Sequence, residues 1–320
     1  MNKFYNIAKN TFIETIRQPV YAVLISIALL LFVISPSLTM YTMEDDSKLL
    51  REIGLSTLFL SSLFIAIFAA SGAVAQEIEN KTITTVLSKP VPRPLFILAK
   101  FAGVTAAVML AHYVCSIGLL MSIRHGMVYT ADDIIDWTVV VCAAVSIGCT
   151  VILTSFFNFI YDWKFSSTLV VLFSIFATVA IIILVFFDRT WTFNPSENGI
   201  NTVDIYGSIL LLLAAVIFVA LAIAFSTRFN IVVTLSSCIG VFLLGLISDY
   251  TFGRLAQQYT WANIGRFLVP NIQVFWITDA IYEGVGVPGF YILICSVYTI
   301  CYTSAIILLA IALFQKRQVG

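Results

Sequence analysis

The stretch LSTLFLSSLFIAIFAASGAVA at residues 55–75 contains no charged side chain. It is followed by QEIENKTITTVLSKPVPRP at 76–94 and by LFILAKFAGVTAAVMLAHYVCSIGLLMSI at 95–123. Each apolar run is long enough to cross a hydrocarbon core about 30 Å thick, which takes roughly 20 helical residues. Two such runs around one charged connection are typical of a helical membrane protein. We therefore expect an all-α fold, because backbone polar groups in lipid must be satisfied within each segment.

The composition of the whole chain supports the same conclusion. Of the 320 residues, 60% are hydrophobic and 11% are charged, and the mean hydropathy is +1.02. These values exclude an ordinary soluble domain. We predict a polytopic integral membrane protein with a single transmembrane domain over residues 1–320 and about eight transmembrane helices (six to eight). The expected spans are 19–40, 55–75, 95–123, 137–161, 166–187, 207–225, 231–248 and 289–314.

The distribution of charges predicts the orientation, because Lys and Arg resist translocation more than acids do. One set of alternate loops, together with both termini, carries eleven basic and four acidic residues, whereas the other set carries six basic and thirteen acidic residues. We therefore expect both termini to be cytoplasmic and the protein to lie, with multiple passes, in the cell membrane, such as the inner membrane of a bacterium. The equal totals of 17 basic and 17 acidic residues give no sign of a nucleic-acid partner.

Residues 1–18 precede the first span and have a helical pattern of apolar positions. These positions are Phe4, Ile7, Ala8, Phe12 and Ile16. Charged residues such as Lys9, Glu14 and Arg17 lie between them. We predict an amphipathic helix in the interface of the inner leaflet, with Pro19 marking the bend into the membrane. The alternative is a longer first span with a charged start.

Residues 77–94 form the longest expected cytoplasmic connection between spans, and they have the features of a docking element. Thr82 can cap a short helix, and Pro90 disfavours helix at Lys89. The prolines at 90, 92 and 94 stiffen the return to the membrane. The alternative is an ordinary polar linker whose charges serve only to fix the topology.

The sequence lacks the motifs of ATP hydrolysis and of membrane enzymes. No GxxxxGK[ST] phosphate cradle occurs, and HExxH and GxSxG are also missing. We expect no catalytic residue in this chain, so active transport would need an ATPase on another polypeptide. The six cysteines lie in apolar runs without metal-ligand spacing, and we therefore expect no metal site and no cofactor in this chain.

His112 lies inside the third expected span, where ionisable groups are costly. A histidine hydrogen-bonded to a neighbouring helix is the simpler interpretation, and a role in proton or substrate movement is the alternative. An ATP-independent secondary carrier or channel, coupled to protons through His112, is therefore a second hypothesis for the function. A structural membrane anchor for another complex is a third.

Residues 249–288 are too polar to span the membrane twice, yet they are rich in aromatic side chains. These are Phe252, Tyr259, Trp261, Phe267, Phe275 and Trp276. Such a content of aromatic residues is typical of the membrane interface. We expect an extracytoplasmic interfacial segment, with a plain interfacial loop as the alternative. Residues 40–54, with Glu44, Asp45 and Asp46, are expected to form a solvated outer turn.

Four stretches carry a resemblance to a known family. They are IAKNTFIETIRQP at 7–19, EIENKTITTVLSKPVPRPLFILAK at 77–100, LAIAFSTRFNIVVTLSSCIGVFLLGLISDYTFG at 221–253 with PNIQVFWITDAIYEG at 270–284, and LLAIALFQKRQVG at 308–320. In these stretches the chain resembles the permease subunits of ABC-2 type transporters, especially those grouped with the permeases of multicopper-enzyme maturation systems.

The resemblance implies an elbow helix at the N-terminus that includes Phe4, Ile7, Phe12, Ile16 and Arg17. It implies that the coupling segment, residues 77–94, contains a coupling helix that docks on a cytoplasmic ABC ATPase subunit. The docking residues would be Glu77, Glu79, Lys81, Thr82, Ile83, Leu87, Ser88, Lys89, Pro90 and Arg93. Re-entrant helices are implied within residues 249–288.

The implied function is that of the transmembrane permease subunit of an ATP-driven ABC transporter, and we expect export. ATP and Mg²⁺ would bind to the partner subunit. A second permease copy or a homologue would complete a dimer, and membrane lipid would surround it.

Overall fold

The computed structural model describes residues 3–39, 46–79, 92–126, 135–195, 199–255, 259–278, 280 and 286–315. Within these residues the regular secondary structure is helical, apart from one isolated bridge between Phe187 and Phe193. The all-α expectation is therefore confirmed for the described part of the chain.

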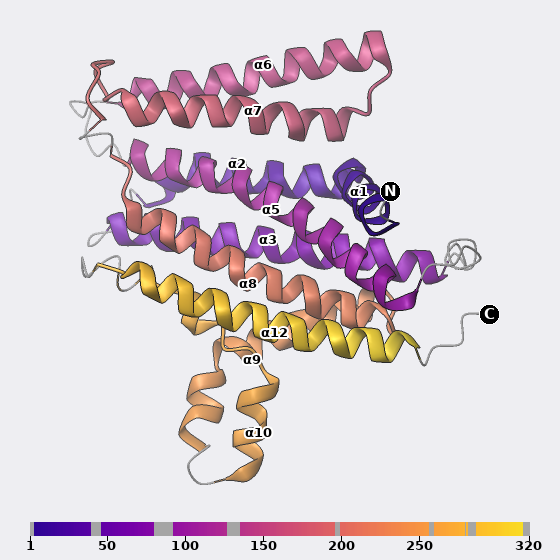
Figure 1. The fold of residues 1–320 in the computed structure, drawn as a ribbon. Helices are drawn as coiled ribbons and strands as arrows, with labels where there is room; N and C mark the ends of the chain where they lie inside the picture. Colours follow the sequence, from indigo (N-terminus) through magenta and orange to yellow (C-terminus); the bar gives the residue numbers. More distant parts are fainter. Residues whose placement is uncertain are drawn as a thin grey trace.

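Seven described helices are long and apolar enough to cross a membrane (Figure 1). They are α2 (Pro19–Thr39), α3 (Asp46–Glu79), α5 (Arg93–His125), α6 (Trp137–Tyr161), α7 (Phe165–Phe186), α8 (Thr202–Ser226) and α12 (Gly289–Gln315). The remaining expected span, 231–248, corresponds to α9 (Ile231–Leu246), which has 16 residues. At 1.5 Å per residue, a helix of this length rises only about 24 Å, less than the hydrocarbon thickness.

Charged side chains mark the two ends of the bundle. At one end, Arg93 at the start of α5 contacts Gln315 at the end of α12, and Lys100 pairs with Glu77 near the end of α3. At the other end, Arg51 of α3 pairs with Asp204 of α8, and Arg124 pairs with Asp136. We call these the α1 end and the distal end, because α1 (Lys3–Arg17) lies at the first (Figure 1).

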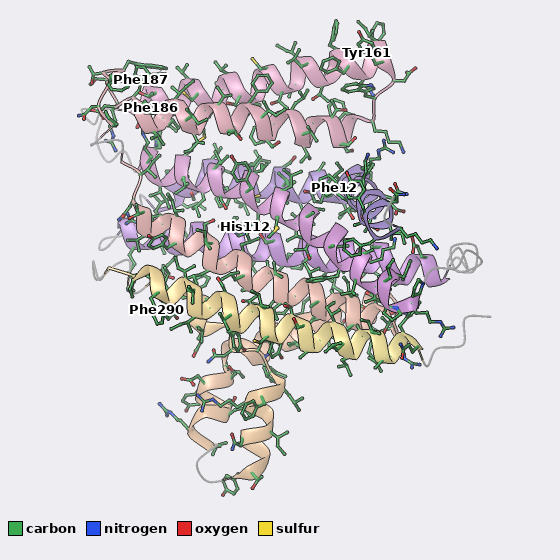
Figure 2. All side chains as sticks on the ribbon, in the orientation of Figure 1. Phe12, His112, Tyr161, Phe186, Phe187 and Phe290 are labelled. Carbon is green, nitrogen blue, oxygen red and sulfur yellow. The ribbon has the colours of Figure 1, made fainter. Side chains whose placement is uncertain are left out.

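The two ends correspond to the two charge sets that the sequence separates. The α1 end holds Arg93, Lys100 and Lys164, whereas the acids Asp136 and Asp204 lie at the distal end. The positive-inside rule therefore predicts that the α1 end faces the cytoplasm. Aromatic side chains lie at both ends of the spans, with Tyr161 at one end and Phe186, Phe187 and Phe290 at the other (Figure 2), as in the aromatic belts of membrane proteins.

The centre of the bundle is α8, which packs most extensively against α3 and α12 (Figure 1). Its side chains between Ile217 and Ala224 are almost all buried. Phe218 of α8 meets Phe59 of α3 and Phe242 of α9, with ring centroids 6.2 Å apart in both pairs. Burial on all sides explains why the sequence of α8 is apolar without an amphipathic pattern.

The hairpin of α6 and α7 forms an outer layer beside α2 and α5 (Figure 1). Many of its side chains are exposed, including Val145, Ile152 and Ile175. The hydroxyl groups of Tyr113 on α5 and Thr178 on α7 are hydrogen-bonded to each other at 2.9 Å. This hairpin therefore presents a large part of its surface to lipid.

After α9 the chain leaves the bundle and returns. η2 (Asp249–Gly253) and α10 (Thr260–Leu268) form a second hairpin that projects sideways (Figure 1). Phe267 and Leu268 of α10 are 81% and 72% exposed, as suits a lipid-facing or interfacial element. Phe275 of η3 (Gln273–Phe275), which was also expected at the interface, is instead buried in the core.

Three tyrosines of α12 satisfy backbone groups of the returning segment, residues 268–274. The hydroxyl groups of Tyr302 and Tyr291 donate to the carbonyl oxygens of Leu268 and Val274, and the amide of Asn271 donates to the hydroxyl of Tyr298. Non-helical backbone at membrane depth is tolerated only where protein or water satisfies its polar groups. These tyrosines explain how an irregular segment can lie beside α12.

Candidate functional site

The candidate site is the α1 end of the bundle, where the coupling segment leaves α3 and enters α5. Residues 80–91, which include Lys81, Thr82, Ile83, Leu87, Ser88, Lys89 and Pro90, lie outside the described residues. Glu79 is the last residue of α3. The structure therefore shows how both ends of the coupling segment are attached, through Glu77 and Arg93.

Glu77 is fixed by an ion pair to α5. Its Oε1 accepts a hydrogen bond from Nζ of Lys100 at 2.6 Å, and the side chains are 20% and 4% exposed. The ammonium also lies 5.6 Å from the ring centroid of Phe96. A buried charge pair is costly to separate, because each ion would be left unpaired in a medium of low dielectric constant. The end of α3 is thus held against the first turns of α5.

Arg93 fixes the other end of the coupling segment to the last turn of α12. Its Nη1 donates to the carbonyl oxygen of Gln315 at 2.7 Å, and its guanidinium lies 6.0 Å from the ring centroid of Phe314. That ring stacks on Phe96 at 5.8 Å. An arginine is well suited to this position, because its charge favours the C-terminal end of a helix.

These contacts join the consecutive helices α3 and α5 to α12, which is distant in sequence. A force applied between residues 77 and 93 would reach α3, α5 and α12 through the same small cluster, which consists of Glu77, Arg93, Phe96, Lys100 and Phe314. We call this set the anchor cluster.

The N-terminal helix lies at the same end and crosses the bundle helices (Figure 1). The helix ends at Arg17, and α2 begins at Pro19, as the sequence predicts. The alternative of one extended first span is therefore wrong.

The contact between α1 and α5 depends on a glycine. A Cβ atom on Gly103 would lie 2.5 Å from the carbonyl oxygen of Ala8 and 2.8 Å from Cβ of Thr11. Thr11, Thr15 and Ile16 of α1 are buried, and small residues permit such close helix packing in membranes. The helix is therefore bound to the protein as well as suited to the lipid interface.

The residues predicted for the elbow helix divide between the protein interior and the exposed surface of α1. Ile16 is buried, Ile7 and Phe12 are half-buried, and Phe4 and Arg17 are exposed. Phe12 packs against the core, and Figure 2 shows it on α1 at the edge of the bundle.

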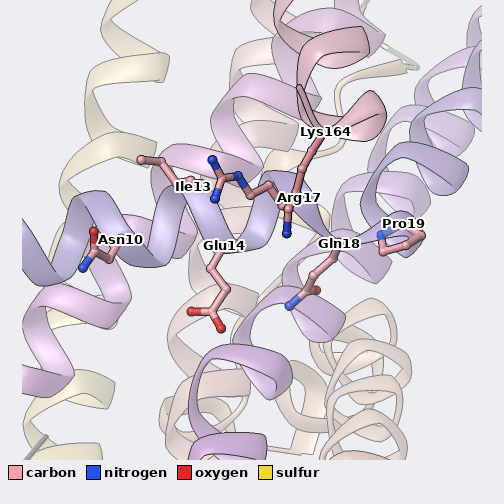
Figure 3. A pocket seen from close by; sticks show the side chains of 7 residues that line it. All are labelled: Asn10, Ile13, Glu14, Arg17, Gln18, Pro19 and Lys164. Atoms are coloured by element: carbon pink, nitrogen blue, oxygen red, sulfur yellow. The ribbon is translucent and has the colours of Figure 1, made fainter. Parts of the chain in front are cut away.

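A polar hollow lies where α1 meets the loop between α6 and α7 (Figure 3). It has a volume of about 440 Å³ and includes Asn10, Glu14, Arg17, Gln18 and Lys164 among its lining residues. The hollow joins the elbow to the outer α6–α7 layer, so a partner bound at this face would contact both.

His112 has hydrogen-bond partners on two neighbouring helices. Its Nδ1 lies 2.8 Å from the hydroxyl of Ser62 on α3, and its Nε2 lies 2.9 Å from the carbonyl oxygen of Ser208 on α8. The side chain is buried in the middle of the bundle (Figure 2). The interpretation as a histidine bonded to neighbouring helices is confirmed, and these contacts give no specific support to a proton carrier.

The remaining candidate ligands do not assemble into a site within the described residues. No group of three or more His, Cys, Asp or Glu that could hold a metal ion occurs there. The cysteines are free, with Cys115, Cys142, Cys238 and Cys295 buried, Cys149 half-buried and Cys301 exposed. Asp46 begins α3, whereas Glu44 and Asp45 lie outside the described residues.

Sequence reasoning did not find two features of the structure. It did not pair Arg93 with the end of α12, and it did not find the ion pair of Arg124 with Asp136 at the distal end. The available signal was the position of each charge at the end of an expected span, where a partner on another helix reduces the cost of burial.

Comparison with known proteins identifies a family for the first half of the chain. The family model described as ABC-2 family transporter protein matches residues 5–161, which extend from α1 through the coupling segment to the end of α6. No curated protein matches the chain. The resemblance to ABC-2 permeases is thereby confirmed over these residues, and the match supports a multi-pass membrane permease component of a transporter.

Proposed function

We propose that this chain, whose residues 5–161 match the ABC-2 transporter family, is the permease subunit of an ATP-driven transporter that moves its cargo toward the outer face. ATP and Mg²⁺ would bind to a separate cytoplasmic ATPase subunit, which docks on the α1 end. A second copy of the chain, or a homologue, would complete the transporter.

The observation that carries this proposal is the attachment of both ends of the coupling segment. Glu77 is bonded to Lys100 and Arg93 to the carbonyl oxygen of Gln315, so both ends are joined to membrane-spanning helices. A freely hanging linker would not transmit a push from an ATPase, whereas a segment fixed at both ends can move α3, α5 and α12 together. This arrangement favours docking over the alternative of a plain linker.

Docking can be tested without disturbing the anchor cluster. The double substitution Ile83→Glu/Leu87→Glu places charges at two apolar positions among the expected docking residues, and Tyr250→Glu, at a 63% exposed position of η2, is the control. We expect the double variant to lose co-purification with a P-loop ATPase at unchanged membrane abundance, and the control to retain it. Equal co-purification of both variants would contradict the proposal.

The residues proposed for docking also include Glu77, Glu79 and Arg93. Their joint replacement by alanine is expected to reduce ATPase association, but it also breaks both attachments of the segment. Comparison with Ile83→Glu/Leu87→Glu separates loss of the docking face from loss of the anchor.

The second candidate function is an ATP-independent carrier. It predicts that transport depends on the proton gradient and not on ATP. Transport that survives ATP depletion but stops when the proton gradient is dissipated would select the carrier. A structural anchor would show neither transport nor nucleotide dependence.

A further inference from the structure

A cavity of about 420 Å³ lies between two layers of the membrane domain. Helices α2 and α5 form one wall, and the α6–α7 hairpin forms the other. Its lining is predominantly apolar and includes Phe32, Val114, Ala143, Ile147, Phe173 and Ala177. The volume falls within the range of roughly 300–1,000 Å³ that is usual for small-molecule sites.

The cavity extends from the protein interior to the lipid-facing surface. Phe32 and Ala177 in its lining are 2% exposed, whereas Val33 and Ile147 are 69% and 49% exposed. All four helices have the length and hydropathy of membrane spans, so the medium at the opening is the hydrocarbon of the bilayer. Water would find few polar partners along such a lining, and an acyl chain is the molecule available there.

The size of the cavity distinguishes between the possible occupants. A single turn of helix, about 5.4 Å high and about 10 Å wide, already occupies on the order of 400 Å³. A helix of a second copy would therefore need a larger opening, whereas a flexible chain can follow a cavity of this volume.

Hydrogen-bonding groups gather at one end of the cavity. Ser37, Ser122 and His125 belong to the lining. Beside them, Nη2 of Arg189 donates to the carbonyl oxygen of Arg124 at 3.2 Å, and the Arg189 side chain is 50% exposed. This is the distal end, which the charge distribution assigns to the outer leaflet.

Two aspartates lie beside these arginines within the described residues. Arg124 and Arg189 both approach Asp136, at 3.2 Å and 3.8 Å, and the carboxylate of Asp188 accepts a hydrogen bond from the amide of Arg189. The half-exposed guanidinium of Arg189 is therefore the group that can donate hydrogen bonds to a phosphate. A phosphate is common to zwitterionic and anionic phospholipids.

We propose that this cavity binds one acyl chain of an outer-leaflet phospholipid, with the lipid phosphate at Arg189. The chain would fill the space between α5 and α6, and the phosphate would stay at the polar distal end. This proposal does not depend on ATP coupling or on the identity of the transported cargo.

The test uses the full-length protein in vesicles of phosphatidylcholine and phosphatidylglycerol, doped with a phosphatidylcholine that carries a photoreactive diazirine in one acyl chain. Peptide mapping after illumination should place the label on α5, α6 and α7. An excess of unlabelled phospholipid should reduce that label in the wild-type protein, and labelling that no excess of lipid displaces would overturn the proposal.

Ala143→Phe places a ring in the cavity. The control is Val145→Phe, which adds the same ring to the same helix at a residue that is 56% exposed. We expect the first variant to lose most of the label on α5 and α7 and the second to keep it. Ala144→Phe, at another lining position, serves the same purpose if Ala143→Phe does not accumulate. Equal labelling of the cavity-filling and control variants would contradict the proposal.

The phosphate contact is tested separately. Because a hydrogen bond to a charged group typically changes a binding constant by about ten-fold, Arg189→Gln should lower the label by a factor of this order. Phosphatidylcholine and phosphatidylglycerol should compete equally well. Labelling by a diazirine fatty acid as strong as by the phospholipid, together with no effect of Arg189→Gln, would rule out a phospholipid as the occupant and point to a free fatty acid.

Discussion

The carboxylate of Asp136 accepts a hydrogen bond from Nε of Arg124 at 3.2 Å, and both side chains are buried. The pair joins the end of α5 to the start of α6, where Oδ1 of Asp136 also accepts from the amide of Val139. Arg124 donates further to the carbonyl oxygens of Leu184 and Phe187 at the end of α7. This ion pair therefore helps to attach the α6–α7 layer to the rest of the bundle.

Removing one member of this pair should destabilise the protein strongly. We expect Asp136→Ala to lower the free energy of unfolding by about 3–5 kcal/mol, because it leaves a buried guanidinium without its carboxylate. The double variant Arg124→Leu/Asp136→Leu should lose less than Asp136→Ala. Unfolding in detergent measures both, and Asp162→Asn, at an exposed position, is the control that should remain near wild type.

The anchor cluster predicts a rescue by charge reversal. Lys100→Met leaves Glu77 without its ammonium partner, and we expect a loss of about 2 kcal/mol, because Glu77 retains some access to water. Exchange of the two residues, Glu77→Lys/Lys100→Glu, should recover part of that loss. Thermal unfolding together with ATPase co-purification measures the effect, and a double variant no better than Lys100→Met would show that the pair does not hold the segment.

The close approach of α1 to α5 predicts that bulk at Gly103 separates these helices. Thr11→Cys can report this separation in a Cys301→Ser background, which removes the exposed native cysteine. The new thiol should be protected from maleimide, because Thr11 is buried. Gly103→Val should make that cysteine reactive. Gly148→Val is the matched control, since a Cβ atom there meets nothing within 4 Å, and reactivity that also rises in the control would contradict the explanation.

The hydrogen bonds of His112 predict a structural role. His112→Leu removes bonds to α3 and α8, and we expect a loss of about 1 kcal/mol, as is usual for interhelical hydrogen bonds in membranes. Transport by this variant should keep its ATP dependence at a reduced protein yield. If the variant were stable but had lost a response to the proton gradient, His112 would instead be a proton carrier.

The tyrosines of α12 predict that the returning segment depends on their hydroxyl groups. Tyr302→Phe and Tyr291→Phe each leave a carbonyl oxygen of residues 268–274 without its donor, and each should cost about 1 kcal/mol. Tyr250→Phe, on the exposed surface of η2, is the control. Thermal unfolding in detergent distinguishes them, and equal midpoints for all three variants would mean that these bonds contribute nothing.

Several elements of the fold were predictable because lipid imposes a simple rule on the chain. Long apolar runs such as 55–75 and 95–123 must be helical, and the structure places them in α3 and α5. The bend at Pro19 and the N-terminal helix were equally predictable, since they depend on local pattern. The expected span at 231–248 is a shorter helix, because the chain leaves the bundle after Leu246 and is held by side chains of α12 that are distant in sequence.

The candidate site was predictable only in part. The sequence identified Glu77 and Arg93 as ends of a coupling segment, but it could not show that Arg93 contacts Gln315, because 222 positions separate the two residues. The identity of the residues between these ends, from Lys81 to Pro90, remains the basis of the docking prediction.

The sequence by itself determined that this is a helical membrane protein, which runs are long enough to span the bilayer, and which end carries the basic charges. Each of these properties follows from the cost of placing polar backbone and charged side chains in hydrocarbon, a cost that acts on short segments one at a time. Only the tertiary structure decided which helices meet, such as α5 with α12 at Arg93 and α5 with α6 at Arg124, and where a cavity remains between the layers. Helices in lipid are uniformly apolar on their surfaces, so their partners are selected by close packing and by single polar contacts that no local pattern reveals.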